Sequence, residues 1–127
     1  MKKTVALLLD GETDIIFCAG PSEAQVKEAK AKNVEFEYTL FGYESFVFIV
    51  NPENPLEDIS VEQIKAIYSG ELTAWDELGA EGLGEIIAYQ RHEDSGSQTA
   101  LEKLMGDTPI MEAPQMYVSD GMEDILM

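Results

Sequence analysis

The segment "YQRHEDSGSQTALEKLMG", residues 89–106, joins an arginine to a turn rich in serine and glycine and then to a helix-forming run. It predicts a strand that delivers Arg91 at its carboxyl end, a loop over residues 91–97 and a helix that Gly106 closes. The first N–H groups of a helix have no partner inside it, and the helix dipole places partial positive charge there. The start of this helix can therefore bind an anion or can simply be capped by its own chain.

The anion-binding interpretation uses the polar groups of the turn as donors. Arg91 offers a planar fork of N–H groups that suits an oxyanion. Gly96 lets the backbone approach a ligand closely, and the hydroxyls of Ser95 and Ser97 add further donors. The parts needed to hold a tetrahedral anion at a helix N-terminus all lie between Arg91 and Thr99.

The capping interpretation uses the same residues without a ligand. Ser95 or Ser97 can act as the N-cap and satisfy the first helical N–H groups, while Arg91 pairs with Glu93 or Asp94. The residues of this turn alone leave both interpretations open.

The sequence contains no motif of catalysis or metal binding with the required spacing. The run "DSGSQT", residues 94–99, has neither the lysine of a phosphate-binding P-loop nor the Gly-x-Ser-x-Gly pattern of a hydrolase. His92 is the only histidine and we expect it to be an exposed loop residue, because no carboxylate is placed by sequence to orient it. Cysteine, histidine and acidic residues show no metal-ligand spacing. We therefore expect no enzyme activity, no metal and no cofactor.

The charge balance also limits the choice of partner. The 127-residue chain has 8 Lys and Arg against 25 Asp and Glu, a formal net charge of −17. Nucleic acids and anionic membranes require clustered cations, so neither is an expected partner. The single cysteine, Cys18, excludes an intrachain disulfide, and its apolar neighbours predict a packed strand residue.

The N-terminal stretch has a weak resemblance to a signal peptide. Two lysines precede an apolar run, but the run from Thr4 to Leu9 is too short for the hydrophobic part of such a peptide. We expect no signal peptide in this chain and no segment of membrane-spanning length. Residues 3–9 instead predict the end of a helix that stops near Gly11.

Two capping boxes predict helices with defined starts. Ser22 followed by Gln25 begins one helix, and Ser60 followed by Gln63 begins another. The first is polar and should lie on the surface until a stop at Asn33. The second has an apolar face and ends at a glycine, and a short helical turn around a tryptophan follows it; the residues concerned are Val61, Ile64, Ile67, Tyr68, Gly70 and Trp75.

Apolar and alternating runs predict strands between these helices. "DIIFCAG" and "YESFVFIVN" are nearly continuous apolar runs, "VEFEYTL" alternates, and "EIIAYQ" precedes Arg91. The C-terminal run "QMYVSDGMEDILM" is ambiguous and can be an extended piece followed by a first helical turn. Alternating strands and helices indicate an α/β fold with a mixed or parallel sheet. The predicted strands cover residues 14–20, 34–40, 43–51 and 85–90, and residues 41–46 are the expected crossing between two lobes.

Two long segments together resemble the phosphate-binding proteins of bacterial phosphate ABC transporters. These are "DISVEQIKAIYSGELTAWDELG" and "IIAYQRHEDSGSQTALEKLMG", residues 58–79 and 86–106, and the course of "DGETDIIFCAGPSE" and "FVFIVNPENPL" fits as well. The resemblance implies a type 2 periplasmic-binding-protein fold, in which two α/β lobes close over an anion. Residues 1–42 would be a remnant of the first lobe, and residues 43–127 would be a C-terminally incomplete second lobe that carries the anion loop.

The resemblance also implies roles for the turn after Arg91. The guanidinium of Arg91 would bind the anion, and Glu93 would pair with and orient that guanidinium. The turn itself would donate hydroxyl and backbone hydrogen bonds to the anion and continue into the helix; these residues are Ser95, Gly96, Ser97, Gln98 and Thr99. Many members of the family have an aspartate that accepts the proton of phosphate, whereas Gly20 lies near that position here. Oxyanion binding is therefore the firmer expectation and phosphate the first candidate.

The leading hypothesis is a substrate-binding component of an importer, located outside the cytoplasmic membrane. Its expected partners are phosphate or a similar inorganic anion and the membrane permease of an ABC transporter. With one half of the site present, the chain alone should bind phosphate weakly or undetectably. The alternative hypothesis is an interaction or assembly module that keeps the fold and self-associates through apolar surface that an incomplete lobe leaves uncovered.

Overall fold

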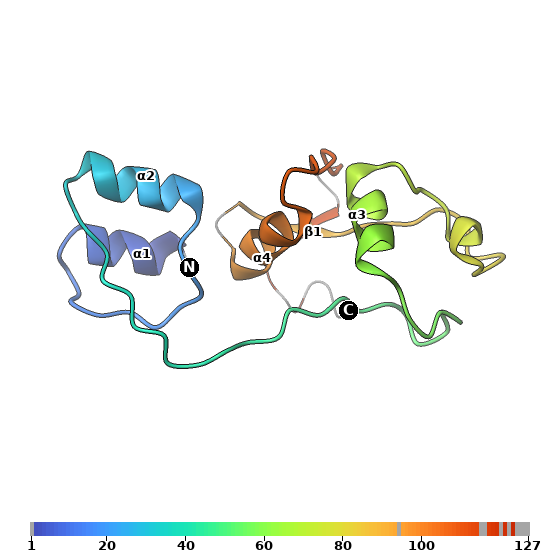
Figure 1. Ribbon diagram of the computed structural model, residues 1–127, viewed down its shortest axis with the longest axis horizontal. Coiled ribbons are helices and arrows are strands. Elements are labelled where there is room, and N and C mark those ends of the chain that lie inside the picture. Colours follow the sequence, from blue (N-terminus) through green and yellow to red (C-terminus); the bar gives the residue numbers. More distant parts are fainter. Residues whose placement is uncertain (1, 94, 115–116, 120, 122, 124–127) are drawn as a thin grey trace. The chain divides into compact units, whose positions relative to one another are not determined.

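The computed structural model describes residues 2–93, 95–114, 117–119, 121 and 123 of the chain (Figure 1). The chain divides into two compact units. The first consists of Met1–Phe46 and His92–Ala100, and the second of Val47–Arg91 and Leu101–Met127. Helix α4, Gly96–Met105, contributes its first turns to the first unit and its remainder to the second.

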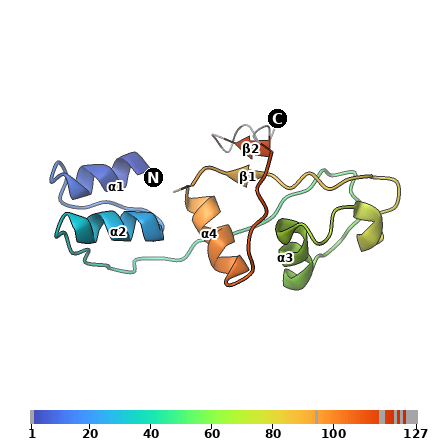
Figure 2. The same ribbon diagram turned by 90° about the horizontal axis from the view of Figure 1, so that it is seen from above.

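The first unit is built around two helices that lie side by side in both ribbon views (Figures 1 and 2). These are α1, Lys2–Leu9, and α2, Glu23–Ala31. Val5 and Leu9 of α1 pack with Ala29 of α2 to form a small apolar core. Three half-buried side chains from the connecting segments cover this core: Ile16, Val34 and Phe36.

Local sequence determines where α2 begins and ends. The Ser22 hydroxyl accepts a hydrogen bond from the N–H of Gln25 at 3.3 Å, and the Ser22 N–H donates to the Gln25 side chain at 2.9 Å. Asn33 takes a positive φ of 55° after the last turn, a conformation that asparagine tolerates better than most residues. Just before it, Lys32 forms a 2.7 Å ion pair with Asp10, which raises the pKa of Lys32. The predicted capping box and stop are confirmed.

The second unit contains α3, Val61–Ser69, which the second capping box begins. Gln63 donates its N–H to the Ser60 hydroxyl at 3.1 Å, and its side chain accepts from the Ser60 N–H at 2.8 Å. Ile64 and Ile67 are buried on the predicted apolar face, and Gly70 ends the helix with φ 84°. A short 3₁₀ helix, Trp75–Leu78, follows where a helical turn was expected.

The strand content of the described residues is small. Strand β1, Gln90–Arg91, pairs in parallel with β2, Val118–Ser119, so that Arg91 lies opposite Ser119. Ala74 and Glu85 form an isolated antiparallel bridge. The predicted strand before Arg91 is thus reduced to its last residue, although its carboxyl end lies where the sequence placed it.

The strands predicted over residues 14–20, 34–40 and 43–51 are not formed in the structure. A strand exists only when a neighbour pairs with its backbone, and these segments find no such neighbour among the described residues. Many of their large apolar side chains are accordingly exposed, apart from Ile16, Val34 and Phe36 on the helix core, and Cys18 is an exposed free thiol rather than a packed residue. The helical turn expected at the C-terminus falls mainly on residues outside those that the structure describes.

A glycine-to-alanine pair tests the helix stop of the second unit. At Gly70 a Cβ would find ordinary contacts with Met111 at 3.5 Å, so the penalty of Gly70→Ala comes from its φ of 84°. We expect the free energy of unfolding in urea to fall by about 1–2 kcal/mol. Gly42→Ala is the matched control, because Gly42 has open space and no positive φ. Equal stability of the two variants would contradict this account.

Tyr68 provides a test in alkaline solution. Its hydroxyl donates to the Tyr89 carbonyl at 3.0 Å, and burial raises its pKa above the ordinary 10.0. The unfolded chain therefore loses this proton first, and the stability that neutral Tyr68 contributes is lost as the pH rises above that value. Tyr68→Phe should cost about 1 kcal/mol near neutrality, and the difference from the wild type should shrink in alkali.

The control for this measurement is Tyr43→Phe. Tyr43 is 94% exposed and should change neither the free energy of unfolding nor its pH dependence. Urea titrations of the three proteins at neutral and alkaline pH make the comparison. A difference between the wild type and Tyr68→Phe that stays constant with pH would show that Tyr68 titrates alike in the folded and unfolded states.

Candidate functional site

Ser95 is the N-cap of α4. Its hydroxyl accepts a hydrogen bond from the N–H of Gln98 at 3.1 Å. Its carbonyl accepts from both the N–H and the hydroxyl of Thr99, each at 3.0 Å. Its own N–H donates to the carbonyl of His92 at 3.1 Å. The capping interpretation of the turn is therefore realised, and Ser95 rather than Ser97 is the residue that performs it.

The cap does not use every donor at this end of the helix. The N–H of Gly96, the first residue of α4, has no acceptor within the described part of the chain. The Ser95 hydroxyl accepts one hydrogen bond, and its own hydrogen meets no acceptor among the described residues. Capping and anion binding can thus coexist, because they use different lone pairs and hydrogens of the same groups.

A cavity of about 410 Å³ lies in the first unit beside these donors. Its volume exceeds that of one water many times over, so a small solvated ligand fits. A Cβ built on Gly96 would make an ordinary contact with the Cβ of Ala19 at 3.9 Å, so these two residues lie next to one another in the wall. The residues that line the cavity are Thr4, Phe17, Cys18, Ala19, Glu44, Ser45, Phe46, Gly96, Ser97 and Ala100.

The lining is mixed in polarity and holds one charged side chain, that of Glu44. Thr4, Ser45 and Ser97 are the hydroxyl-bearing residues of the lining. No lysine or arginine is among the lining residues, so the partial positive charge that this cavity offers an anion is that of the α4 N-terminus. Such a lining offers donors together with one carboxylate acceptor, the combination that a protonated oxyanion requires.

Sequence reasoning identified Gly96 and Ser97 but missed the opposite wall. Glu44, Ser45 and Phe46 come from the segment that was expected only to cross between lobes. Nothing in their local pattern indicates a binding role. One feature of the sequence could have indicated this wall: a segment that crosses between two lobes often passes beside the ligand. That feature identifies a segment but not its individual binding residues.

Arg91 lies in the second unit, at the end of β1 as predicted. It is half-buried, and its Nε donates to the carbonyl of Ser119 at 3.2 Å. Glu93 is exposed and makes no ion pair within the described residues, so its orientation of Arg91 stays a prediction. Asp94, the other expected partner, is outside the residues that the structure describes. His92 is exposed, as expected.

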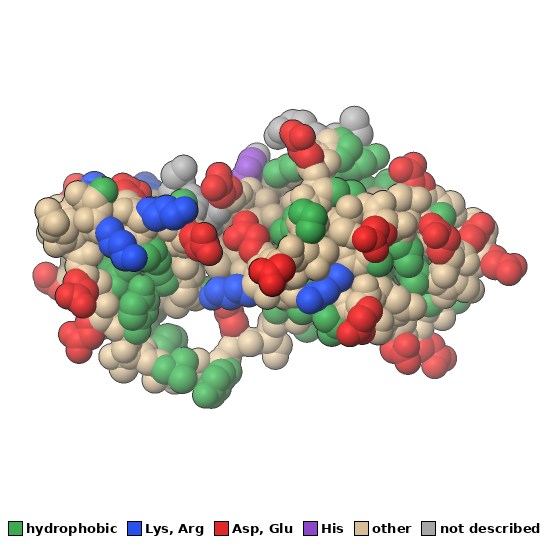
Figure 3. Space-filling view, turned by 45° about the horizontal axis from the view of Figure 1, so that its top comes forward, with side chains coloured by type: hydrophobic (Ala, Val, Ile, Leu, Met, Phe, Trp, Pro, Cys, Tyr) green, Lys and Arg blue, Asp and Glu red, His purple; other side chains and the backbone are tan. Residues whose placement is uncertain are grey.

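Acidic side chains are spread over the face of the molecule shown in Figure 3, with few lysines and arginines among them. They do not gather into a metal site: within the residues the structure describes, no group of three or more His, Cys, Asp or Glu could hold a metal ion. No helix in that part of the chain is both long and apolar enough to cross a membrane.

The family model of the PBP superfamily domain matches residues 2–126, and the chain therefore belongs to this superfamily. A relative with a named function is the phosphate-binding protein PstS of Borreliella burgdorferi, which is 30% identical over 67 residues. The match includes 53% of this chain but only 24% of the length of the relative. No solved structure matches the chain significantly.

These comparisons confirm the resemblance to the phosphate-binding proteins and the α/β binding-protein fold class. The assignment of residues 1–42 and 43–127 to two lobes stays a prediction. The positions of Arg91 and the Ser95–Thr99 turn agree with the predicted local structure, but their contact with a ligand is likewise still a prediction.

Two substitutions of Ser95 test its role as the cap. Ser95→Ala removes the acceptor for the Gln98 N–H and should lower the free energy of unfolding by about 1 kcal/mol. Ser95→Asp supplies another good N-cap acceptor and should stay within a few tenths of a kcal/mol of the wild type. Chemical denaturation monitored by circular dichroism makes the comparison. Unchanged stability of Ser95→Ala would show that the cap contributes nothing.

Proposed function

We propose that this chain is the substrate-binding component, or part of one, of an importer for an inorganic oxyanion, with phosphate as the first candidate. One observation carries the proposal: the N–H of Gly96, which has no acceptor among the described residues, belongs to a residue that lines a cavity, in a chain that belongs to the PBP superfamily. The similarity to a phosphate-binding protein supports phosphate as the ligand. The partner would be a membrane permease, and the location would be extracytoplasmic.

In this proposal the start of α4 provides the fixed donors. The N–H groups of Gly96 and Ser97 and the hydroxyls of Ser95 and Ser97 point their partial positive charge at the anion. By the resemblance, the guanidinium of Arg91 would also bind the anion, and Glu93 would orient it. Gln98 and Thr99 support the site indirectly, because both are buried and hold the cap in place through Ser95.

Glu44 would accept the hydrogen bond from the proton of phosphate. Many members of the family use an aspartate for this, and Gly20, which lies near that position here, has no side chain to do so. Phosphate carries at least one proton near neutral pH, whereas sulfate carries none. A carboxylate in the lining accepts a hydrogen bond from a protonated oxyanion and repels one that has no proton to donate. Glu44 is the charged residue of this cavity wall, and it would favour phosphate over sulfate for this reason.

The net charge of −17 does not exclude anion binding, but it affects the rate. Hydrogen bonds from fixed dipoles act at contact, whereas the field of surface carboxylates is screened over ~8 Å at physiological salt. The acidic surface should therefore slow the encounter with phosphate rather than prevent its binding. Binding without chemical change is all that the proposal requires, so no catalytic group or cofactor enters it.

A second candidate function, an assembly module, is favoured by a different observation. Large apolar side chains are exposed along the segments that failed to form strands, including Tyr38, Leu40, Phe41 and Val47. A soluble acidic chain gains by covering such side chains with a partner. This observation does not compete with the cavity, because one chain can hold an anion and a partner at separate places.

Calorimetry and phosphorus NMR with inorganic phosphate test the leading proposal. We expect weak binding by the chain alone, with a dissociation constant on the order of 1 mM or higher. Ser95→Asp should weaken it at least roughly tenfold, because a carboxylate there repels the anion while the cap is preserved. Glu44→Gln should leave phosphate bound and should reduce the preference for phosphate over sulfate.

These measurements test three parts of the proposal separately: the position of the anion, the completeness of the site and the role of Glu44. Equal phosphate binding by the wild type and Ser95→Asp would place the anion elsewhere. A dissociation constant in the micromolar range or tighter would show that this chain holds a complete site rather than half of one. An unchanged preference in Glu44→Gln would remove Glu44 from the choice of anion without affecting the location of the site.

A further inference from the structure

Residues 34–41 form an extended segment along one side of the first unit, called the edge below. The start of this segment is held in place by the first unit. Val34 is fixed by its N–H, which donates to the Ala29 carbonyl at 2.9 Å. Val34 and Phe36 are half-buried against the helix core, whereas Glu35 and Glu37, which alternate with them, are exposed. This alternation is that of extended backbone, in which successive side chains point to opposite faces.

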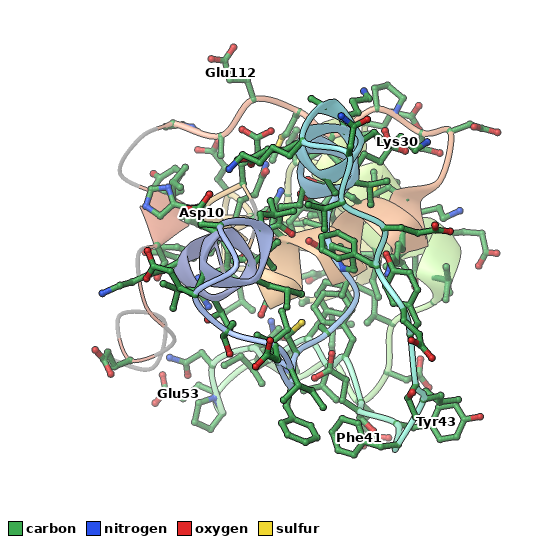
Figure 4. The ribbon with its side chains drawn as sticks, turned by 90° about the vertical axis from the view of Figure 1, so that its left-hand side faces the viewer. Asp10, Lys30, Phe41, Tyr43, Glu53 and Glu112 are labelled. Atoms are coloured by element: carbon green, nitrogen blue, oxygen red, sulfur yellow. The ribbon has the colours of Figure 1, made fainter. Side chains whose placement is uncertain are left out.

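The apolar face continues beyond the core without a cover. The ring of Phe36 lies edge-on to that of Tyr38 with centroids 6.1 Å apart, as expected for neighbours on one face. Tyr38 is 66% exposed and Leu40 is 72% exposed. The loop that follows carries Phe41 and Tyr43, and Figure 4 shows both rings directed away from the helices.

The backbone along this edge is also unpaired. Residues 35–41 make no hydrogen bond within the described part of the chain. An extended edge with free N–H and C=O groups and an apolar face is a template for another strand. A segment that pairs with residues 35–41 should place no glutamate directly opposite Glu35 or Glu37, because like charges directly opposite one another are destabilising.

A second copy of the same segment meets this condition in one antiparallel register. With Tyr38 opposite Tyr38 of the second copy, Phe36 lies opposite Leu40 and Glu37 lies opposite Thr39. Glu35 then lies opposite Phe41. Phe36, Tyr38 and Leu40 of both copies share one face, and no two carboxylates are directly opposed.

Other registers are less favourable, because they oppose glutamates or lose apolar contacts. A shift of one residue places apolar side chains on the polar face of the partner. Registers centred on Glu37 or on Phe36 place glutamate directly opposite glutamate, as does a parallel in-register pairing. The register centred on Thr39 places Phe36 opposite Gly42 and loses an apolar contact. The pattern of this segment is therefore self-complementary about Tyr38.

We infer that two copies of the chain associate by antiparallel pairing of residues 35–41, with Tyr38 on the twofold axis. The pairing supplies hydrogen bonds to the N–H and C=O groups of alternate residues on the paired side. It also brings Phe36, Tyr38 and Leu40 of the two copies together. A contact of this size is small, so the dimer is weak and reversible. The inference does not rest on phosphate binding and uses none of its proposed ligands.

Charge makes the association depend on salt. Each copy carries a formal net charge of −17, so two copies repel at low ionic strength. Added salt screens this repulsion and leaves the backbone hydrogen bonds and apolar contacts. Sedimentation velocity of the unmodified chain at high concentration should show a dimer fraction that rises with sodium chloride. A monomer at both low and high salt overturns the inference.

Disulfide cross-linking tests the register. In a Cys18→Ser background, which removes the exposed native thiol, Tyr38→Cys places two thiols opposite one another at a distance that a disulfide spans. Leu40→Cys is the matched control, because it is equally exposed but would lie ~14 Å from its counterpart in this register. Under mild oxidation Tyr38→Cys should cross-link at least roughly tenfold faster than Leu40→Cys.

A mixed sample gives the complementary result. Phe36→Cys and Leu40→Cys, each slow alone, should cross-link rapidly with each other when the two variants are combined. Equal rates for Tyr38→Cys and Leu40→Cys would show random collision and overturn the inference. A sedimenting dimer in which Tyr38→Cys does not cross-link would place the contact on another surface and overturn it as well.

Discussion

The need of every backbone N–H and C=O for a partner explains most of this structure. A helix meets that need within its own segment, so α2 and α3 form from local sequence and from the capping boxes that begin them. A strand meets it only through a neighbour. The segments at residues 14–20, 34–40 and 43–51 form no strand in the described part of the chain, and many of their apolar side chains are exposed. The same rule leaves the first N–H of α4 available to a ligand.

The sequence could predict those features whose causes are local. Ser22 with Gln25 and Ser60 with Gln63 act within three residues, and a glycine with positive φ ends α3 at Gly70. Strand formation could not be predicted in the same way. Alternation shows that one face of a segment is apolar, but it does not show which segment pairs with it. The prediction of strands at residues 14–20, 34–40 and 43–51 was therefore wrong, because the sequence of a segment does not supply its partner.

The candidate site likewise has some features with local causes and some that depend on tertiary structure. The turn at Ser95–Ser97 and the position of Arg91 at a strand end follow from neighbouring residues, and both could be predicted. The cavity wall that contains Glu44 could not, because tertiary structure brings it to Gly96 from a distant part of the sequence. Ser95 also shows that capping and ligand binding are not exclusive alternatives. Its oxygen accepts from Gln98, while its hydrogen is still available to donate.

The unpaired edge and the cavity wall belong to one continuous stretch of chain. Residues 35–41 run directly into Glu44, Ser45 and Phe46, which line the cavity. In the inferred dimer, pairing of the edge would restrict the backbone at one end of this stretch, and an anion bound in the cavity would restrict it at the other. Two events that order the same segment each reduce the conformational entropy that the other must overcome. Linkage requires the effect to be reciprocal, so an anion that favours pairing is itself bound more tightly by the paired form.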